Sequence, residues 1–197
     1  TGATVTVSPS LVAAPGVSDY GGYQVSCAGE MDGSVALNPG GGTPPYTASW
    51  SNGAIGLLIG DLAAGQYRVT LTDQSGCQRI DSFLLVEPPA MMMSISSRPP
   101  GCFGENTGEI TVGSVQGGVG PFTFLLNGTA KFTTDVFPAV ISGLEAGAYQ
   151  LVAADINGCE TSAAALLPEP TALSVDLGMD TSVYLGDSVL LDAVVTK

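Results

Sequence analysis

The sequence predicts an all-β fold of tandem β-sandwich domains, each closed by one internal disulfide. Three observations predict it: turn residues interrupt the chain throughout, a pattern of about 80 residues occurs twice, and each copy carries two cysteines. With 27 Gly and 13 Pro in 197 residues, the chain favours short strands and turns over long helices. Because 45% of the residues are hydrophobic and only 12% are charged, we expect the chain to fold.

The internal repeat is the strongest signal in the sequence. Residues 27–35 and 102–110 both read Cys-x-Gly-Glu-x-x-Gly-x-Val or Ile. Further along, each copy has a Gly-Gly turn followed by proline and an aromatic residue, an Asn-Gly turn, a Leu-x-x-Gly-x-Tyr motif, an Asp-x-x-Gly-Cys motif and a final Glu-Pro. The offset between the copies grows from 75 to 82 residues, so the second copy is expected to carry a longer surface loop around residues 130–140.

The segments between these turns are expected to be strands. They are residues 4–7, 34–37, 46–50, 67–72 and 82–86 in the first copy, 92–95, 122–126, 149–154 and 163–167 in the second, and 173–177 and 188–195 after it. Such short strands in units of about 80 residues fit small Ig-like sandwiches better than propeller blades or solenoid turns. Trp50, its counterpart Leu126, Tyr67 and Tyr149 are predicted to lie in the two cores.

The repeat also predicts the domain boundaries. Residues 1–88 form the first predicted sandwich and residues 89–170 the second, while residues 171–197, which lack the Cys-x-Gly motif, open a further and truncated β domain. Proline fixes φ and favours extended backbone, so the Pro88-Pro89 junction is expected to be short and stiff. The two predicted domains should therefore behave as a rod.

The charge of the chain excludes several classes of partner. Five Lys and Arg against eighteen Asp and Glu give a net charge of -13, which repels nucleic acid and anionic lipid surfaces. No run of eighteen apolar residues occurs, so membrane insertion is not expected.

The four cysteines fit disulfides better than zinc or redox chemistry, because no Cys-x-x-Cys pair occurs. Disulfides indicate an oxidising compartment. Four cysteines allow three pairings, and equivalent positions in the two copies select Cys27 with Cys77 and Cys102 with Cys159. The other two pairings would join the copies, and the remaining alternative is free, buried thiols.

Two other kinds of site were weighed. Asp73 and Asp155 lie in matched turns, and Glu30 and Glu105 in another matched pair, so these four carboxylates are candidate calcium ligands. Capping of tight turns explains the two aspartates equally well and is the favoured interpretation. Histidine is absent, which removes His-based catalysis, and a small sandwich has little room for a cleft, so neither enzyme activity nor a cofactor is expected.

A family resemblance rests on a series of motifs. In the first copy they are Tyr23 to Gly29, Asp32 to Ser34, Gly41 to Tyr46, Trp50 to Gly53, Leu62 to Val69 and Asp73 to Cys77. The series resembles the SprB-type repeat of large Bacteroidota cell-surface proteins, including gliding-motility adhesins. The resemblance implies secretion by the type IX route, an extracellular position at the cell surface, and a role as a rod-like spacer or adhesin stalk in a filament. It also implies that residues 171–197 open an Ig- or PKD-like domain and that Ser188 is an O-glycosylation acceptor.

The alternative function is a glycan- or protein-binding Ig-like module. Exposed aromatic side chains, Tyr20 with Tyr23 or Phe132 with Phe137, would form its surface, although packing explains these residues as well. The expected partners are neighbouring domains of the same chain, other copies in a fibre, and surface glycans.

Overall fold

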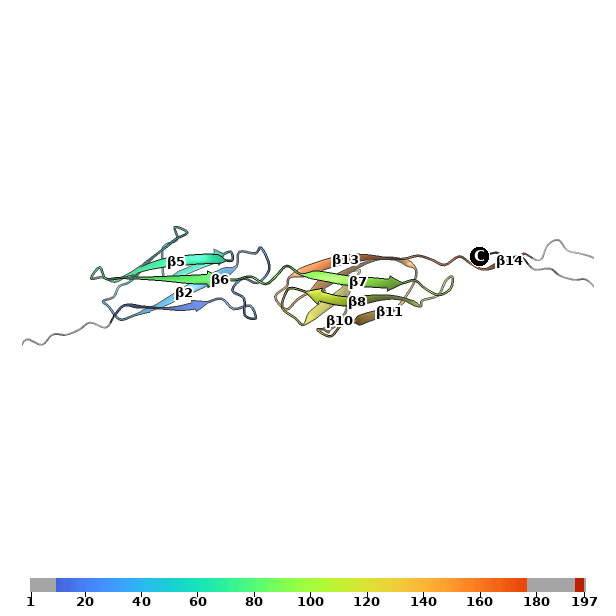
Figure 1. Cartoon of the computed structure of the whole chain (residues 1–197), viewed down its shortest axis with the longest axis horizontal. Coiled ribbons are helices and arrows are strands. Elements are labelled where there is room, and N and C mark those ends of the chain that lie inside the picture. Colours follow the sequence, from blue (N-terminus) through green and yellow to red (C-terminus); the bar gives the residue numbers. More distant parts are fainter. Residues whose placement is uncertain (1–9, 177–193, 197) are drawn as a thin grey trace, which may run out of the picture. The chain divides into compact units, whose positions relative to one another are not determined.

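The computed structural model describes residues 10–176 and 194–196, and within them all regular structure is β-strand (Figure 1). The chain divides into two compact units. The first consists of residues 1–92 with 115–123 and 153–161, and the second consists of the remaining segments. The predicted all-β class is confirmed.

The described part of the first sandwich has six strands. They are β1 (Val12–Val17), β2 (Gly33–Gly40), β3 (Thr47–Trp50), β4 (Leu58–Leu62), β5 (Gly65–Thr72) and β6 (Gln78–Leu85). Two antiparallel sheets result, in the orders β1-β2-β4 and β3-β5-β6. These orders match the A-B-E and C-F-G strands of an immunoglobulin-type sandwich, whose two sheets are A-B-E-D and C-F-G.

The core of this sandwich lies between the two sheets, because each sheet turns its apolar side chains to the other. Val35 of β2 and Val69 of β5 are fully buried, and Trp50 is 5% exposed. The indole N–H of Trp50 donates to the Gly56 carbonyl oxygen at 2.9 Å, which satisfies its only polar group. The predicted core position of Trp50 is confirmed, as is that of Leu126 in the second sandwich.

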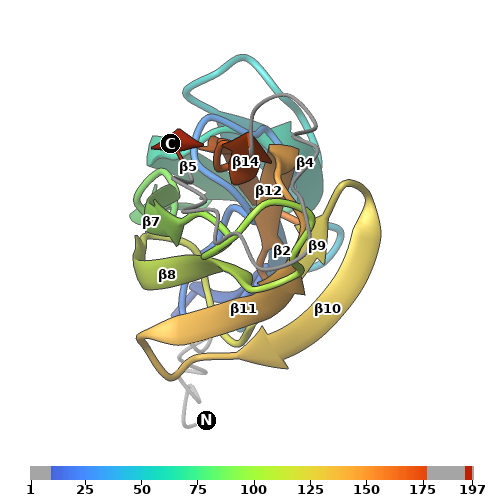
Figure 2. The same cartoon turned by 90° about the vertical axis from the view of Figure 1, so that its right-hand side faces the viewer.

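Within the described residues, the second sandwich has one strand more than the first. Its strands are β7 (Met92–Arg98), β8 (Gly108–Gln116), β9 (Phe122–Leu126), β10 (Thr129–Thr134), β11 (Ala139–Leu144), β12 (Gly147–Ala154) and β13 (Glu160–Leu167). The sheets are β11-β8-β7 and β10-β9-β12-β13. Figure 2 shows the added strand β10 beyond β9.

The predicted surface loop around residues 130–140 is therefore wrong in part, since residues 130–134 belong to the edge strand β10. Asn127 and Gly128 have φ values of 48° and 76°, as a type I′ hairpin turn requires, and this turn leads the chain straight back beside β9. Phe132 of β10 then packs on Phe124 of β9, with 5.2 Å between ring centroids.

The ends of the chain fit the strand predictions less closely. Residues 4–7 lie outside the described residues, and the first described strand is β1, which tolerates Pro15 because it is an edge strand. After the second sandwich, β14 (Ser174–Asp176) pairs antiparallel with β15 (Val194–Thr196). Ser188 lies outside the described residues.

The Leu-x-x-Gly-x-Tyr motif forms a tyrosine corner in each sandwich. The Tyr67 hydroxyl donates to the Ala63 carbonyl oxygen and the Tyr149 hydroxyl to that of Glu145, both at 3.0 Å. This bond links the start of β5 or β12, which correspond to strand F of an Ig-like domain, to the corner before it, and it is a hallmark of such domains. Both tyrosines are half-buried and not inside the core as predicted, and Tyr67 packs against the core of the first sandwich.

The second glycine of each Cys-x-Gly-Glu-x-x-Gly motif should be intolerant of a side chain. A Cβ on Gly33 would lie 2.7 Å from the Leu62 carbonyl oxygen, and one on Gly108 would lie 2.7 Å from that of Leu144. We expect Gly33→Ala and Gly108→Ala each to lower the free energy of unfolding by about 1–3 kcal/mol in urea denaturation. Gly60→Ala, where nothing lies within 4 Å, is the matched control. An equal loss in the control would contradict the steric explanation.

Candidate functional site

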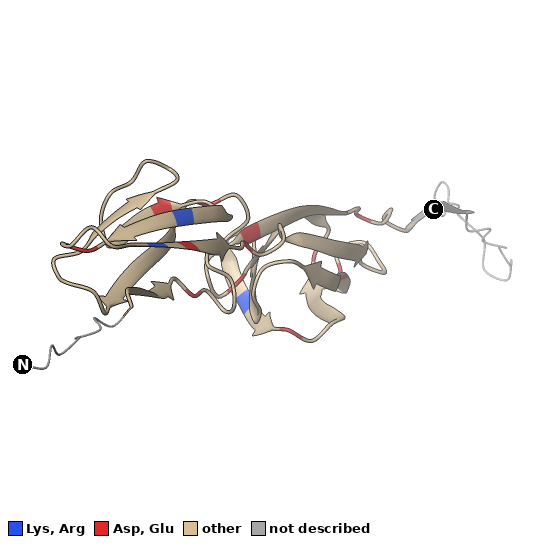
Figure 3. Ribbon diagram, turned by 60° about the vertical axis from the view of Figure 1, so that its left-hand side comes forward, with Lys and Arg blue, Asp and Glu red and all other residues tan. Residues whose placement is uncertain are grey.

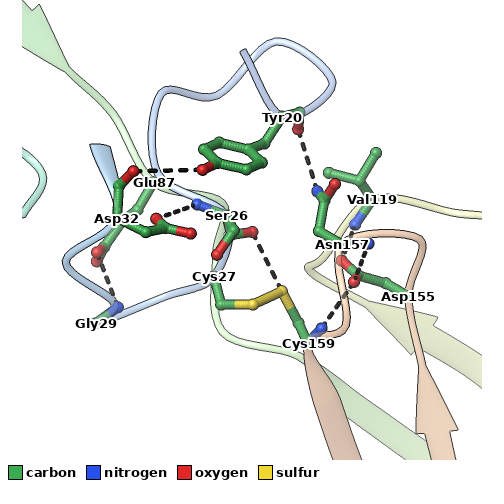
Figure 4. The surroundings of a disulfide bond; sticks show 10 residues. All are labelled: Tyr20, Ser26, Cys27, Gly29, Asp32, Glu87, Val119, Asp155, Asn157 and Cys159. Carbon is green, nitrogen blue, oxygen red and sulfur yellow. Dashed lines mark hydrogen bonds between the residues drawn. A yellow bond between two sulfur atoms is a disulfide. The ribbon is translucent and has the colours of Figure 1, made fainter. Parts of the chain in front are cut away.

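Two of the four cysteines form a disulfide, which joins the two sequence copies. Cys27, the first cysteine of copy one, bonds Cys159, the second cysteine of copy two, with 5.5 Å between their Cα atoms and a sequence separation of 132 (Figure 4). Both residues belong to the first compact unit. Cys77 and Cys102 are free and exposed. The predicted pairing of Cys27 with Cys77 and of Cys102 with Cys159 is therefore wrong.

The length of a strand explains why the first copy cannot close its own disulfide. Cys77 directly precedes β6, whereas Cys27 is held beyond the end of the same strand, since the N–H of Gln24 donates to the Val86 carbonyl oxygen at 2.9 Å. The eight residues of β6 span about 26 Å, at about 3.3 Å per residue, and a disulfide bridges Cα atoms only about 4.4–6.8 Å apart. The same argument separates Cys102 from Cys159, which lie at opposite ends of β13.

A glutamate that the sequence analysis did not single out fixes the turn of the first cysteine. The Gly29 N–H donates to the Glu87 carboxylate at 2.9 Å, and the Gly104 N–H donates to the Glu169 carboxylate at 2.7 Å. The Glu-Pro motif therefore does more than end a strand, because its carboxylate ties the Cys-x-Gly turn to the end of β6 or β13. Its occurrence at equivalent positions in both copies was the signal that could have identified it.

An aspartate fixes the turn of the second cysteine. Asp155 Oδ1 accepts the N–H groups of Asn157 and Cys159, both at 2.9 Å, and its Oδ2 accepts the Val119 N–H at 2.8 Å. In the first copy, Asp73 Oδ1 accepts the Cys77 N–H at 2.8 Å. The Asp-x-x-Gly-Cys motif is thus a capped turn that orients the cysteine backbone.

This geometry gives the calcium hypothesis no support. The carboxylates of Asp73 and Asp155 are buried and face backbone N–H donors, which occupy the oxygens that a cation would need. Glu30 and Glu105 are exposed and lie in the turns at the other ends of β6 and β13. The structure therefore does not bring the four candidates together, and the described residues contain no group of three or more His, Cys, Asp or Glu side chains placed to hold a metal ion.

A close sulfur–oxygen contact and two hydrogen bonds lie near the bonded pair. Cys159 is 8% exposed, and its sulfur lies 3.2 Å from the Ser26 carbonyl oxygen. The Asn157 side chain donates to the Tyr20 carbonyl oxygen at 3.2 Å, and the Gly118 N–H donates to the Pro89 carbonyl oxygen at 3.2 Å. Figure 4 shows the first two of these contacts beside the sulfur pair. The first two contacts therefore connect the same two segments that the disulfide joins.

The aromatic residues proposed as a binding surface are engaged elsewhere. Phe132 and Phe137 lie around Phe124, with ring centroids 5.2 and 6.2 Å from it, and the Tyr20 hydroxyl donates to the Asp32 carbonyl oxygen at 3.3 Å. Tyr23 is half-buried. An exposed apolar surface lies instead over β12 and β13, where a shallow pocket is lined by residues that include Asn127, Tyr149, Gln150 and Leu166.

Among the described residues, the basic ones lie on strands and most of the acidic ones lie in the loops between strands (Figure 3). Arg79 pairs with Asp81 at 3.0 Å and Arg98 with Glu109 at 3.1 Å, so two of the basic residues that the structure describes face a carboxylate. Within the described ranges, no helix has the length and apolarity needed to cross a bilayer.

Comparison with known proteins finds one family model that matches both copies in part. The family model of the SprB repeat matches residues 24–55 and 94–130. A solved chain from work entitled "Structural basis for Dscam isoform specificity" is similar at 15% identity with a TM-score of 0.33, over 81% of this chain and 46% of that one, so this chain spans less than half of its length. No curated protein matches the chain.

The disulfide assignment predicts a specific pattern of stability losses. Cys27→Ser, Cys159→Ser and the double variant should each lower the free energy of unfolding in urea by about 2–4 kcal/mol, and the losses should not add, because either substitution removes the whole bond. Cys77→Ser is the matched control and should change stability by less than about 0.5 kcal/mol. Peptide mapping without reductant should recover the Cys27–Cys159 pair, and recovery of Cys27–Cys77 would refute the assignment.

The Asp73 cap predicts a pH dependence. The Thr43 N–H, above all, lowers the pKa of Asp73, and the N–H groups of its own turn add to this against the opposing effect of burial. Because the folded pKa lies below the unfolded value of about 3.9, the contribution is full above that pH and is lost as the pH falls through the folded pKa. Asp73→Asn should therefore destabilise the protein at pH 7, and the difference from wild type in urea denaturation should shrink below pH 4.

The exposed Asp61 supplies the control, since Asp61→Asn keeps a residue type that tolerates its φ of 55°. A constant difference between wild type and Asp73→Asn from pH 7 to pH 3 would rule out the proposed protonation effect.

Proposed function

We propose, on the premise that the chain carries two SprB repeats, that it is a non-catalytic structural segment of a large secreted cell-surface or filament protein. It acts as a rod-like spacer or adhesin stalk, with residues 1–88 and 89–170 as its two repeats and residues 171–197 as the start of a further domain. Export by the type IX route and service in gliding motility belong to the same proposal. The observation that carries it is the Cys27–Cys159 disulfide, which joins one copy of the repeat to the next.

A second covalent connection suits a stalk for a mechanical reason. Consecutive repeats that share only a peptide linker can swivel about it, whereas a linker and a disulfide together restrict rotation about either one. The linker itself supports the proposal, since Pro88 is fully buried and the Pro89 carbonyl oxygen accepts the Gly118 N–H. A stalk of this kind would transmit a pull along its length.

The redox state of the chain supports a position outside the cell. Disulfides persist in oxidising compartments and are rare in the cytosol. The net charge of -13 is consistent with a surface that remains soluble and avoids anionic lipid. Both properties suit a segment displayed at the cell surface.

A second candidate function, glycan or protein binding, has one observation in its favour. Leu166 of β13 is 69% exposed and lines the pocket with Tyr149 and Gln150, which gives the outer face of this sheet an apolar patch beside hydrogen-bonding groups. If this function holds, binding to a glycan array should be abolished by Leu166→Glu and retained by Leu84→Glu. Leu84 is the equivalent residue of β6 and is 66% exposed. Retention of binding by both variants would remove the pocket from consideration.

The stalk function is tested by pulling single molecules from the two chain ends. With the disulfide intact, the 132 positions between Cys27 and Cys159 cannot extend under load. Reductant should therefore add about 450 Å of extension on full unfolding, at about 3.4 Å for each of these positions. The double variant Cys77→Ser, Cys102→Ser keeps the bond and should behave as wild type does. Equal extension with and without reductant would contradict a covalently locked stalk.

A further inference from the structure

We propose that Cys102 and Cys77 are the two halves of a second disulfide, formed between copies of this chain that join head to tail. Cys102 of one chain would bond Cys77 of the next chain, as Cys27 bonds Cys159 within a single chain. The inference extends the proposed stalk function, because it makes the stalk continuous from one copy to another.

Repeat equivalence is the first argument. Cys102 occupies in copy two the position of Cys27 in copy one, and Cys77 occupies in copy one the position of Cys159 in copy two. The free cysteines are therefore one of each kind, and the equivalents of the two are bonded to each other in this structure.

The local structure of the equivalents is the second argument. The turn of Cys102 is capped by Glu169 at 2.7 Å, and that of Cys27 by Glu87 at 2.9 Å. The Cys77 N–H donates to Asp73 at 2.8 Å, and the Cys159 N–H donates to Asp155 at 2.9 Å. Each free cysteine thus already has the backbone arrangement of its bonded equivalent.

The surfaces around the cysteines are the third argument. The hollow at the bonded pair is lined on one side by Cys27, Ala28 and residues 88–91, and on the other by residues 158–160. The equivalents of the first side, residues 101–103 and 170–173, line an open hollow in the second unit. Cys77 and Gln78, the equivalents of Cys159 and Glu160, line another in the first unit. The two open hollows are therefore lined by the equivalents of the residues on the two sides of the Cys27–Cys159 disulfide.

Exposure and charge favour the same contact. Phe103 and Leu173, at the hollow of Cys102, are 61% and 68% exposed, and a docked copy would cover this apolar surface. Glu30 and Glu160 line the bonded junction together. At the proposed contact between two chains, Glu105 would take the place of Glu30, and Gln78 would take the place of Glu160. The contact between chains therefore lacks this pair of like charges.

The chemistry needs an oxidant, and a low-molecular-weight disulfide such as oxidised glutathione supplies it. The Cys102 thiolate attacks one of its sulfurs and displaces a glutathione thiolate, leaving a mixed disulfide. The Cys77 thiolate of the second copy then attacks the Cys102 sulfur, and the second glutathione thiolate leaves. Two protein thiols lose two protons and two electrons in total, and the oxidant is reduced to two glutathione thiols.

The test uses the full chain and two single variants. Wild type incubated with a mixture of oxidised and reduced glutathione should form dimers and longer species, and mapping should recover a Cys77–Cys102 peptide pair. Cys77→Ser keeps only Cys102 free, and Cys102→Ser keeps only Cys77 free, so neither should dimerise alone. Their mixture should form dimers that grow no further, at least about tenfold above either variant alone, because docking raises the effective thiol concentration.

Dimers of either single variant in amounts equal to those of the mixture would overturn the proposal, as would wild type that stays monomeric or yields only symmetric cysteine pairs. Mapping of Cys27–Cys159 in the same digests separates the two levels of inference. If that pair is present and Cys77–Cys102 is absent, the junction between copies fails while the proposed stalk function stands.

Discussion

The length of one strand governs the covalent structure of this protein. In each sandwich, the last strand begins directly after one cysteine and ends where a glutamate holds the turn of the other. An extended strand of eight residues is several times longer than a disulfide can reach. The two cysteines of a copy therefore cannot bond each other, and the bond that forms connects Cys27 with Cys159.

Two carboxylates in each copy hold the turns that carry the cysteines. The glutamate of the Glu-Pro motif and the aspartate of the Asp-x-x-Gly-Cys motif both accept backbone N–H groups, so each fixes a cysteine turn without a basic partner. Charge-assisted bonds of this kind are short and directional. The absence of histidine and the small number of basic residues in the sequence are thus compatible with precise placement of the sulfurs.

The sequence predicted the fold class correctly and the pairing of the cysteines wrongly, and the difference has a physical reason. Turn motifs and alternating segments mark where strands begin and end, which is why β3, β5, β9 and β12 were predicted closely. Repeat equivalence shows that Cys27 matches Cys102, but it carries no distance, and pairing within a copy was inferred as if the two cysteines lay close together. The strand β10 was missed because a single Asn-Gly turn decides whether residues 129–134 form a loop or an edge strand.

A repeat whose sulfurs bond its neighbours differs physically from one that is closed internally. If each copy closed its own disulfide, the bonds would stabilise single domains and leave the linkers to carry every load. With bonds between copies, the linker and the disulfide connect the same two copies, so a break in either one leaves them joined. Because each copy offers the same two cysteine turns, gain or loss of a whole copy preserves this pattern.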